Sequence, residues 1–416
     1  METTKSFDIP KSLFMEAYRR VKANAGGCGV DQQSLSDYEK HLKDNLYKLW
    51  NRMSSGSYFP PAVKAVPIPK KAGGERILGV PTVADRIAQM VVKLVLEPQI
   101  EPHFLENSYG YRPNKSALDA IAVTRERCWR YDWVLEFDIK GLFDNIPHDL
   151  LMKAVEKHTQ CRWIVLHIGR WLKAPLQRAD GETIERVQGV PQGGVISPLL
   201  SNLFLHYVFD IWMRKNHPTN RWCRYADDGL VHCKTEQQAQ DLLKSLRQRF
   251  AECGLELHPD KTKIVYCKDG NRKCKYEETS FDFLGYTFRR RMCKVKRTQK
   301  IIVSFSPAVS KSAVKSMRKK TRKLRWRLRT DLSIEEIAKY YNPVLRGWLN
   351  YYGRFHRSAL YPVWRHFNKT LVAWAMDKYK HLRKRKTRAG KLIQAIANRQ
   401  PELFVHWQVG MKGAFT

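Results

Sequence analysis

Two adjacent carboxylates, Asp227 and Asp228, stand between two apolar segments whose lengths suit short β-strands. Side chains alternate along a strand, so neighbouring Asp residues fit best on the turn between two strands, where both can approach one ligand. Their charges repel each other unless a cation binds them, and hard divalent cations prefer carboxylates while leaving positions for water and phosphate. An acidic dipeptide is also common on solvated turns, so the pair alone leaves both interpretations open.

The charge balance of the chain indicates a polyanionic partner. Its 416 residues include 75 Lys and Arg against 40 Asp and Glu, a formal net charge of +35. This excess repels itself unless a polyanion neutralises it, and nucleic acid fits best. The chain has no run of about 18 apolar residues and no apolar leader, so we expect a cytoplasmic protein with no membrane partner. Nine scattered Cys without paired spacing indicate reduced thiols, not a zinc site or disulfide framework.

Local sequence patterns predict an α+β fold, because helices and strands mix without strict alternation. With 416 residues and 43% hydrophobic content, the chain is long enough for at least two buried cores. Residues 65–81 predict a hairpin with Gly73 and Gly74 at its turn. Further strands are expected at 133–140 and 281–288, and helices within residues 1–55 and at 83–97, 117–128, 236–253, 311–329, 333–355 and 362–382.

Several polar residues near the ends of these elements are candidates for chemistry. Asp138 lies at the end of a buried strand, where a charge is costly unless it is paired or coordinates a cation. Lys70 and Arg76 flank the expected hairpin turn and could reach over one ligand. Gln192 lies in a glycine-rich loop ahead of the helix that Ser197 begins. Carboxylates from two such strand ends can hold two Mg²⁺, while Lys and Arg pair with a triphosphate, a combination that suits nucleotidyl transfer.

A strongly basic stretch follows the strand at 281–288. Residues 289–330 contain 17 Lys or Arg and no Asp or Glu. Solvated helix faces normally mix both signs, so we favour a helix that binds a nucleic-acid backbone. The tail after residue 382 is again basic, and its aromatic residues from Phe404 to Trp407 indicate that it docks on another part of the protein.

Taken in order, these blocks resemble those of bacterial group II intron reverse transcriptases and maturases of the type that lacks an endonuclease. The resemblance implies a right-hand polymerase, with fingers and an antiparallel palm sheet followed by an α-helical thumb. It implies an N-terminal extension of the fingers at 1–60, fingers and palm at 61–305, a thumb or maturase (X) domain at 306–382 and a basic tail, a candidate DNA-binding region, at 383–416. The matching blocks are residues 68–81, 108–116, 137–144, 191–198, 225–228, 283–285 and 342–352.

The resemblance also implies roles for individual residues. Asp138, Asp227, Asp228 and the main-chain carbonyl of Ile139 would hold two Mg²⁺, with Mn²⁺ as a substitute. Lys70 and Arg76 would grip the triphosphate of the incoming nucleotide, Gln192 would contact it near its sugar, Tyr225 would pack near the primer end, and Lys261 would be a general acid for pyrophosphate. Phe143 would exclude a ribose 2′ hydroxyl, with a core aromatic as its alternative role. The implied nucleic-acid contacts, interleaved with Trp326 and Trp348, are Arg112, Lys311, Lys315, Arg318, Lys319, Arg322, Lys323, Arg325 and Arg346.

The implied function is an RNA-directed DNA polymerase that copies intron RNA for retrohoming and also helps the intron to splice. Its partners would be intron RNA, an RNA template with a DNA primer, target DNA and deoxynucleoside triphosphates. Only residues 383–416 follow the expected thumb, with no Cys after Cys293, so we expect no endonuclease. The alternatives are an RNA-binding maturase with little polymerase activity and a domesticated reverse transcriptase in DNA repair or phage defence. The sequence leaves the oligomeric state open.

Overall fold

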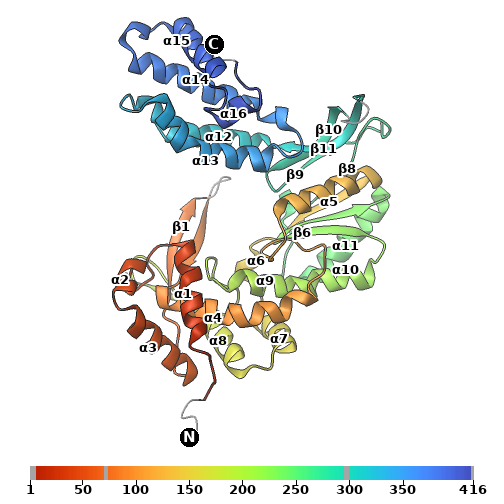
Figure 1. Cartoon of the computed structure of the whole chain (residues 1–416). Helices are drawn as coiled ribbons and strands as arrows, with labels where there is room; N and C mark the ends of the chain where they lie inside the picture. Colours follow the sequence, from red (N-terminus) through yellow and green to blue (C-terminus); the bar gives the residue numbers. More distant parts are fainter. Residues whose placement is uncertain (1–5, 70–73, 295–298, 414–416) are drawn as a thin grey trace. The chain divides into compact units, whose positions relative to one another are not determined.

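The computed structural model describes residues 6–69, 74–294 and 299–413, and its backbone divides into two compact units (Figure 1). The first unit comprises Met1–Ala120 and Leu135–Ile264, and the second comprises Ile121–Val134 and Val265–Thr416. Both contain helices and strands, which confirms the expected α+β class. The division after Ile264 comes earlier than residue 305, where we expected the fingers and palm to end. None of the described helices is both long and apolar enough to cross a membrane.

Helices build the N-terminal part of the first unit. The buried residues of the first helix recur at helical spacing from Phe14 to Val21, so one stripe faces the core. The fourth helix is buried on nearly all sides, and the Thr82 hydroxyl caps it by accepting a hydrogen bond from the Asp85 backbone N–H. These helices confirm the predictions for residues 1–55 and 83–97. They are α1 (Ser12–Asn24), α2 (Leu35–Lys40), α3 (Leu42–Ser54) and α4 (Val83–Ile100), followed by the short η1 (Glu101–His103).

A hairpin of two antiparallel strands forms at residues 63–80, as predicted. Strand β1 (Val63–Pro69) pairs with β2 (Glu75–Val80) from Lys64 opposite Val80 to Pro69 opposite Glu75. Gly73 at the expected turn lies outside the described residues. Two short strands, β4 (Leu176–Gln177) and β5 (Thr183–Ile184), extend this sheet in the order β2-β1-β4-β5.

A second four-stranded sheet carries the Asp pair. Its order is β6-β7-β3-β8, and the apolar segments around the Asp pair form the antiparallel strands β6 and β7. Helix α11 packs on this sheet, because the ring of its Phe250 lies 5.8 Å from that of Phe137 on β3. The four strands are β3 (Trp133–Asp138), β6 (Arg221–Tyr225), β7 (Asp228–Cys233) and β8 (Lys263–Tyr266).

The remaining helices up to residue 261 are interspersed with these strands in the sequence. The helices predicted at 117–128 and 236–253 are confirmed as α5 and α11, and a helix begins at Ser197 as expected. A five-residue π-helix, η2, continues α9, and such segments recur at functional sites. These elements are α5 (Ala117–Arg130), α6 (Leu142–Asn145), α7 (His148–His158), α8 (Arg162–Lys173), α9 (Ser197–Leu205), η2 (His206–Asp210), α10 (Ile211–Asn216), α11 (Glu236–Glu252) and η3 (Pro259–Lys261).

The single strand expected at 281–288 is instead a hairpin. Strand β9 (Ser280–Phe283) turns at Leu284 and Gly285 and pairs with β10 (Tyr286–Lys294), which in turn pairs with β11 (Ile301–Val309). Both turn residues have positive φ angles, +50° and +79°, as two-residue hairpin turns require. The prediction was wrong because Leu is an unusual residue for this conformation, so the sequence gives little sign of the turn.

The basic helix of the second unit ends earlier than predicted. Helix α12 (Lys311–Lys323) stops six residues before 329, and Arg325 takes a positive φ of +46° before the 3₁₀ turn η4 (Trp326–Leu328). Trp326 is fully buried, with its ring 5.0 Å from that of Phe367. This tryptophan is therefore a core residue, which corrects the expectation that it is interleaved with nucleic-acid contacts.

The tail joins the same core as the helices before it. Phe404 and Trp407 are fully buried, so the tail docks as predicted, and its described part belongs to the same hydrophobic core as the helices before it. The Asn368 side-chain oxygen accepts a hydrogen bond from Trp407 Nε1 and lies 2.6 Å from His406 Nε2. The helices, which confirm the predictions at 333–355 and 362–382, are α13 (Ile334–Tyr352), η5 (Arg357–Leu360), α14 (Tyr361–Lys378), η6 (Lys380–Leu382), α15 (Lys386–Arg399) and α16 (Val405–Gln408).

The buried His406 predicts that acid destabilises the second unit. Burial lowers the pKa of His406 to about 3, so the folded state stays neutral where the unfolded chain, with an ordinary pKa of 6.5, binds a proton. Stability should therefore fall as pH drops below about 6.5, by about 2 kcal/mol at pH 5 from this residue. Thermal unfolding from pH 7.5 to 5 should show a smaller loss for His406→Gln than for the unmutated protein. The matched control is His381→Gln at an exposed position, and an unchanged loss in His406→Gln would contradict the prediction.

Candidate active site

The Asp pair lies at the turn of the β6–β7 hairpin, as the sequence predicts. Tyr225 pairs with Asp228 as the last rung, and Ala226 and Asp227 make the turn. Ala226 has a φ of +55°, a left-handed conformation that costs a residue with a Cβ about 1 kcal/mol or more. The surrounding structure must therefore hold this turn in place.

A buried ion pair beneath the turn provides that support. Arg224 and Asp210 are both fully buried, and the Arg224 Nε and Nη2 atoms donate to the two carboxylate oxygens of Asp210 at 2.8 and 2.7 Å. The guanidinium also donates to the Asn202 side chain, to Ser108 Oγ and to the Ala226 carbonyl. One side chain thus connects the turn to α9, to η2 and to the loop that contains Ser108.

The loop at 107–110 also packs against the turn and the strand that leads into it. The Tyr109 N–H donates to the Arg224 carbonyl at 2.8 Å, and the Arg224 N–H donates to the Asn107 carbonyl at 3.0 Å. At Gly110 the two backbones approach so closely that a Cβ would lie 2.3 Å from the Ala226 nitrogen. The fixed loop that the sequence predicts at 108–116 therefore holds the Asp-bearing turn in position.

A second close approach aligns the two carboxylate-bearing strands. A Cβ on Gly229, the residue after the Asp pair, would lie 2.0 Å from the ring of Phe137, the residue before Asp138. Phe137 is itself buried on β3. Only glycine fits beside this ring, because the ring occupies the space that a side chain at residue 229 would need. The end of β3 can therefore pack directly against the start of β7.

The three carboxylates influence one another electrostatically. Burial, followed by the charges of Asp227 and Asp138, raises the pKa of Asp228. Burial and the charge of Asp138 likewise raise the pKa of Asp227, against the opposing effect of Lys261 and Arg76. The ionised forms of Asp227 and Asp228 are therefore disfavoured without a ligand, and a bound cation would stabilise them.

Lys261 supplies positive charge to this cluster. Its Nζ lies 2.9 Å from Asp138 Oδ2, and although burial works against it, this hydrogen bond and the Asp138 charge raise the Lys261 pKa. The lysine comes from the short turn η3. The sequence-based role of general acid for pyrophosphate stays a prediction, and the contact observed is with a carboxylate.

The donor set has the chemistry of a site for a hard divalent cation. Three carboxylates lie close together here, and carboxylates are ligands that such cations prefer. A main-chain oxygen is also available. At the bridge between Ile139 and Leu257, the two backbone hydrogen bonds use the Asp138 carbonyl and the Lys140 N–H, so the Ile139 carbonyl takes no part in the bridge. Within residues 6–69, 74–294 and 299–413, no three His, Cys, Asp or Glu side chains already have an arrangement that could hold a metal ion. Binding therefore requires the carboxylates to turn toward a shared cation.

The candidate nucleotide contacts lie on neighbouring elements of the same unit. Arg76 is exposed on β2, and its Nε donates a hydrogen bond to Gln192 Oε1. Phe143 is half-buried on α6, and its carbonyl accepts from the Val190 N–H at 2.6 Å. Tyr225 is half-buried beside the turn. Lys70 lies outside the described residues, so its position is not part of this geometry.

Tyr111 is a site residue that the sequence analysis did not single out. Its phenol is half-exposed, and after burial the largest contributions to its raised pKa come from the charges of Asp227 and Tyr225. The Tyr111 phenol therefore lies near the Asp-bearing turn. Two signals were available in the sequence. Tyr111 lies in an aromatic loop with glycine and proline, and Arg224, whose ion pair supports the turn, directly follows the apolar residues Trp222 and Cys223 in β6.

One expected nucleic-acid contact is wrong. The Arg112 side chain is only 6% exposed and pairs with Glu101 at 2.7 Å. Its guanidinium also donates to the carbonyls of Leu105 and Ser108, so it stabilises the loop and is not free to bind a phosphate. The other expected contacts are exposed, except for the half-buried Arg318: Lys311, Lys315, Lys319, Arg322, Lys323, Arg325 and Arg346.

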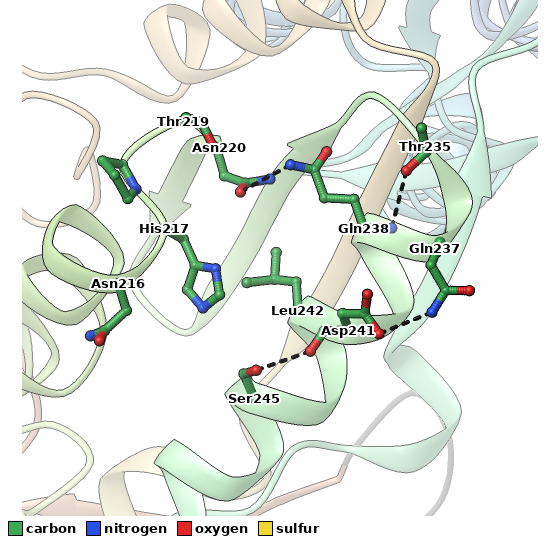
Figure 2. Close-up of a pocket in the computed structure, with 11 residues that line it drawn as sticks. Asn216, His217, Thr219, Asn220, Thr235, Gln237, Gln238, Asp241, Leu242 and Ser245 are labelled. Carbon is green, nitrogen blue, oxygen red and sulfur yellow. Dashed lines mark hydrogen bonds between the residues drawn. The ribbon is translucent and has the colours of Figure 1, made fainter.

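A separate pocket lies at the far end of the β6–β7 hairpin and is not part of this site. Its volume is about 430 Å³, and Figure 2 shows that several of the polar residues lining it form hydrogen bonds with one another. Gln238 donates to Asn220 and Gln237 donates to Asp241. Because no Lys or Arg lines the pocket, it does not suit a phosphate.

Two families of known sequences match the chain. The reverse transcriptase (RNA-dependent DNA polymerase) family matches residues 68–288, a range that includes all the candidate catalytic and nucleotide-binding residues. The group II intron, maturase-specific domain matches residues 314–391. The second match extends past residue 382, consistent with a tail that belongs to the helical unit.

Individual known proteins are also similar to the chain. Protein YkfC of Escherichia coli (strain K12) is 32% identical over 63% of this chain and 76% of its own length. The group II intron-encoded protein LtrA of Lactococcus lactis subsp. cremoris is 26% identical over 70% of this chain, which spans only 57% of that relative. A solved telomerase structure from Candida albicans covers 92% of this chain and 68% of its own, at 14% identity and a TM-score of 0.47.

The buried ion pair predicts a large effect for a single substitution. Arg224→Met would leave the Asp210 carboxylate buried without its arginine, with His206 Nδ1 3.8 Å away, so we expect the first unit to lose about 3 to 5 kcal/mol of unfolding free energy. Chemical denaturation measures this loss. The double variant Arg224→Met with Asp210→Leu removes both charges and should lose less than the single variant. If Arg224→Met loses less than about 1 kcal/mol of unfolding free energy, the ion pair contributes no more than a solvent-exposed salt bridge, which would contradict the prediction.

Proposed function

The chain belongs to the reverse transcriptase family and carries the maturase-specific domain of group II intron proteins, and from that premise we propose that it copies RNA into DNA at Asp138, Asp227 and Asp228. The observation that carries the proposal is the convergence of these three carboxylates from the end of β3 and the β6–β7 turn. The pKa values of Asp227 and Asp228 are raised, which indicates that a bound cation would stabilise their ionised forms. A solvated acidic turn would not need the buried support that Arg224 provides.

The family generally uses divalent metal ions, and we propose Mg²⁺, with Mn²⁺ as a substitute. Two such ions, held by the three Asp and the Ile139 carbonyl, would activate the primer 3′ hydroxyl and neutralise the leaving pyrophosphate. Arg76 and Lys70 would bind the triphosphate through charge-assisted hydrogen bonds.

Further residues would select and align the substrates. Gln192 would contact the nucleotide near its sugar, and Phe143 would exclude a ribose 2′ hydroxyl. Tyr225 would pack near the primer end, while Lys261 would protonate pyrophosphate. These roles predict strong preference for deoxynucleotides over ribonucleotides.

We propose that the partners are intron RNA, an RNA template with a DNA primer, target DNA and deoxynucleoside triphosphates, all consistent with a cytoplasmic location. The basic residues of α12 support binding to a nucleic-acid backbone. If about 6 to 10 phosphates are neutralised, affinity should fall by about 10³ to 10⁵ between about 50 and 200 mM salt.

One face of α13 adds support for nucleic-acid binding. Tyr340, Pro343 and Gly347 are exposed at helical spacing on one side of this helix, beside the exposed Arg346. A Cβ on Gly347 would meet nothing within 4 Å, so the fold does not require a glycine there. Glycine inside a helix costs about 1 kcal/mol relative to alanine. Close approach of a partner's backbone is a reason to keep it.

The catalytic proposal predicts the outcome of primer extension. The unmutated protein should extend a DNA primer on an RNA template with Mg²⁺, and Asp227→Ala should reduce synthesis at least about 10³-fold, because one of the metal ligands is lost. Incorporation of labelled deoxynucleotide measures both.

The matched control is Asp241→Ala, at a pocket residue away from the site, which should extend normally. If the unmutated protein makes no DNA but promotes splicing of an intron RNA, it is the RNA-binding maturase with little polymerase activity. If it extends primers without binding an intron RNA, the domesticated role in DNA repair or phage defence gains support.

The α13 face predicts opposite effects of one substitution on folding and binding. Gly347→Ala should raise the thermal unfolding midpoint of the second unit, because alanine is the better helix former. It should also weaken RNA binding several-fold, because the added methyl group separates the helix from the RNA. Thermal denaturation and a filter-binding titration measure the two effects.

Gly169→Ala is the matched control for this prediction. Gly169 lies inside α8, and its added Cβ would also meet nothing within 4 Å. This variant should gain stability without losing RNA affinity. Equal RNA affinity in the unmutated protein and in both variants would rule out α13 as a contact surface.

A further inference from the structure

Three side chains form a continuous hydrogen-bonded chain beside the active site. Both carboxylate oxygens of Asp144 accept from Gln192 Nε2, each at 2.8 Å. On its other side, Gln192 Oε1 accepts a hydrogen bond from Arg76 Nε. Asp144 is thus connected to the arginine proposed to bind the triphosphate, although the two residues lie on different elements.

The chemistry of the amide makes this chain directional. A glutamine side chain has one donor end and one acceptor end, and a carboxylate can only accept. Asp144 therefore forces the Gln192 nitrogen to face it and the Gln192 oxygen to face Arg76. If the amide turned over, its NH₂ group would meet the guanidinium, and two donors would oppose each other.

The orientation of Gln192 in turn decides which atoms Arg76 presents. A guanidinium has five N–H donors in a rigid planar fork. Because Gln192 engages Nε, the two Nη groups are left to face a ligand, and their fork suits bidentate binding of a phosphate.

The chain of side chains is not needed to hold the backbone together. The Val190 N–H donates to the Phe143 carbonyl and the Gly189 N–H donates to the Ile146 carbonyl, so α6 and the glycine-rich loop are already joined. The Gly79 N–H donates to the Gln192 carbonyl at 2.8 Å, which joins the loop to β2. Asp144 itself is exposed. Its side chain therefore adds orientation to a backbone arrangement that other bonds secure.

A carboxylate near a triphosphate site also has a cost, since it repels the phosphates. If Asp144 holds Gln192 in the orientation that favours binding, this repulsion is offset. If Asp144 were only a surface residue, its charge would weaken triphosphate binding with no compensating effect.

We propose that Asp144 is a positioning residue for the incoming nucleotide, acting through the Gln192 amide on the orientation of the Arg76 guanidinium. This inference rests on the proposed polymerase function and adds a residue to it. In this role Asp144 would act through Gln192, without contacting the reacting atoms or the triphosphate itself.

Single-nucleotide incorporation at saturating template and primer tests the inference. Asp144→Leu should raise KM for the deoxynucleoside triphosphate about tenfold, the effect of one lost hydrogen bond, while kcat changes less than about twofold. Asp144→Glu keeps an acceptor and should recover most of the loss. Asp149→Leu, at an exposed Asp on α7, is the matched control and should keep the KM of the unmutated protein. An unchanged KM in Asp144→Leu would overturn the proposal.

A double-mutant cycle separates positioning from a general structural effect. If Asp144 acts through the chain, adding Asp144→Leu to Gln192→Leu should raise KM by less than about twofold, because the connection is already broken. Independent, additive losses would overturn the proposal. Thermal midpoints of all variants check that they are folded.

Binding without chemistry distinguishes this inference from the function on which it rests. With a primer that ends in a dideoxynucleotide, the triphosphate can bind but cannot react. An affinity lower for Asp144→Leu than for the unmutated protein supports positioning, and equal affinities overturn it. Failure of the unmutated protein to extend a normal primer, while it still binds the triphosphate, would instead contradict the polymerase proposal and leave the affinity comparison intact.

Discussion

The ion pair between Arg224 and Asp210 is the interaction on which the geometry of the active site depends. Both side chains are fully buried, and removing charges from water is costly, so the pair is weak evidence of net stability. Its effect is on geometry: a planar guanidinium with fixed donor directions holds the Ala226 carbonyl, the Ser108 hydroxyl and the Asn202 side chain at once. The turn that carries Asp227 and Asp228 is thereby fixed by a rigid group beneath it.

The same site has to bring like charges together and keep them there. Close backbone approaches accomplish this, since Gly110 lies against the Ala226 nitrogen and Gly229 lies against the Phe137 ring. At both positions a Cβ would be far inside van der Waals contact. The positions of the carboxylates are therefore set by packing between backbones and one aromatic ring, which are less adaptable than contacts between flexible side chains.

Local patterns in the sequence were sufficient where a feature depends on neighbouring residues. Alternation and turn chemistry predicted the β6–β7 hairpin with its Asp pair, and helical spacing predicted α11 and α13 to within a few residues. Local patterns failed at Leu284 and Arg325, because residues with a Cβ at positive φ give no sign of a turn. The end of α12 was also hidden by Lys and Arg, which are good helix formers.

Features that depend on distant residues could not be predicted in this way. Arg112 has the charge of a phosphate contact, and only the structure shows that Glu101 and two carbonyls occupy it. Asp144 follows Phe143 within a recognisable block, yet its connection to Arg76 exists only because the chain brings β2, α6 and the glycine-rich loop together. Sequence indicates which residue types are available, while tertiary structure decides whether a charge is left for a ligand.

The electrostatics of the site explain why a metal-bound triphosphate is the ligand that fits the proposed function. Asp138, Asp227 and Asp228 need positive charge, as the raised pKa values of Asp227 and Asp228 indicate. Arg76, oriented by Gln192, needs negative charge. A free divalent cation would satisfy only the carboxylates, and a free triphosphate would satisfy only the arginine while its charge repelled the carboxylates. A triphosphate with its divalent cation carries both charges close together, so it meets both requirements in one binding event and in one orientation.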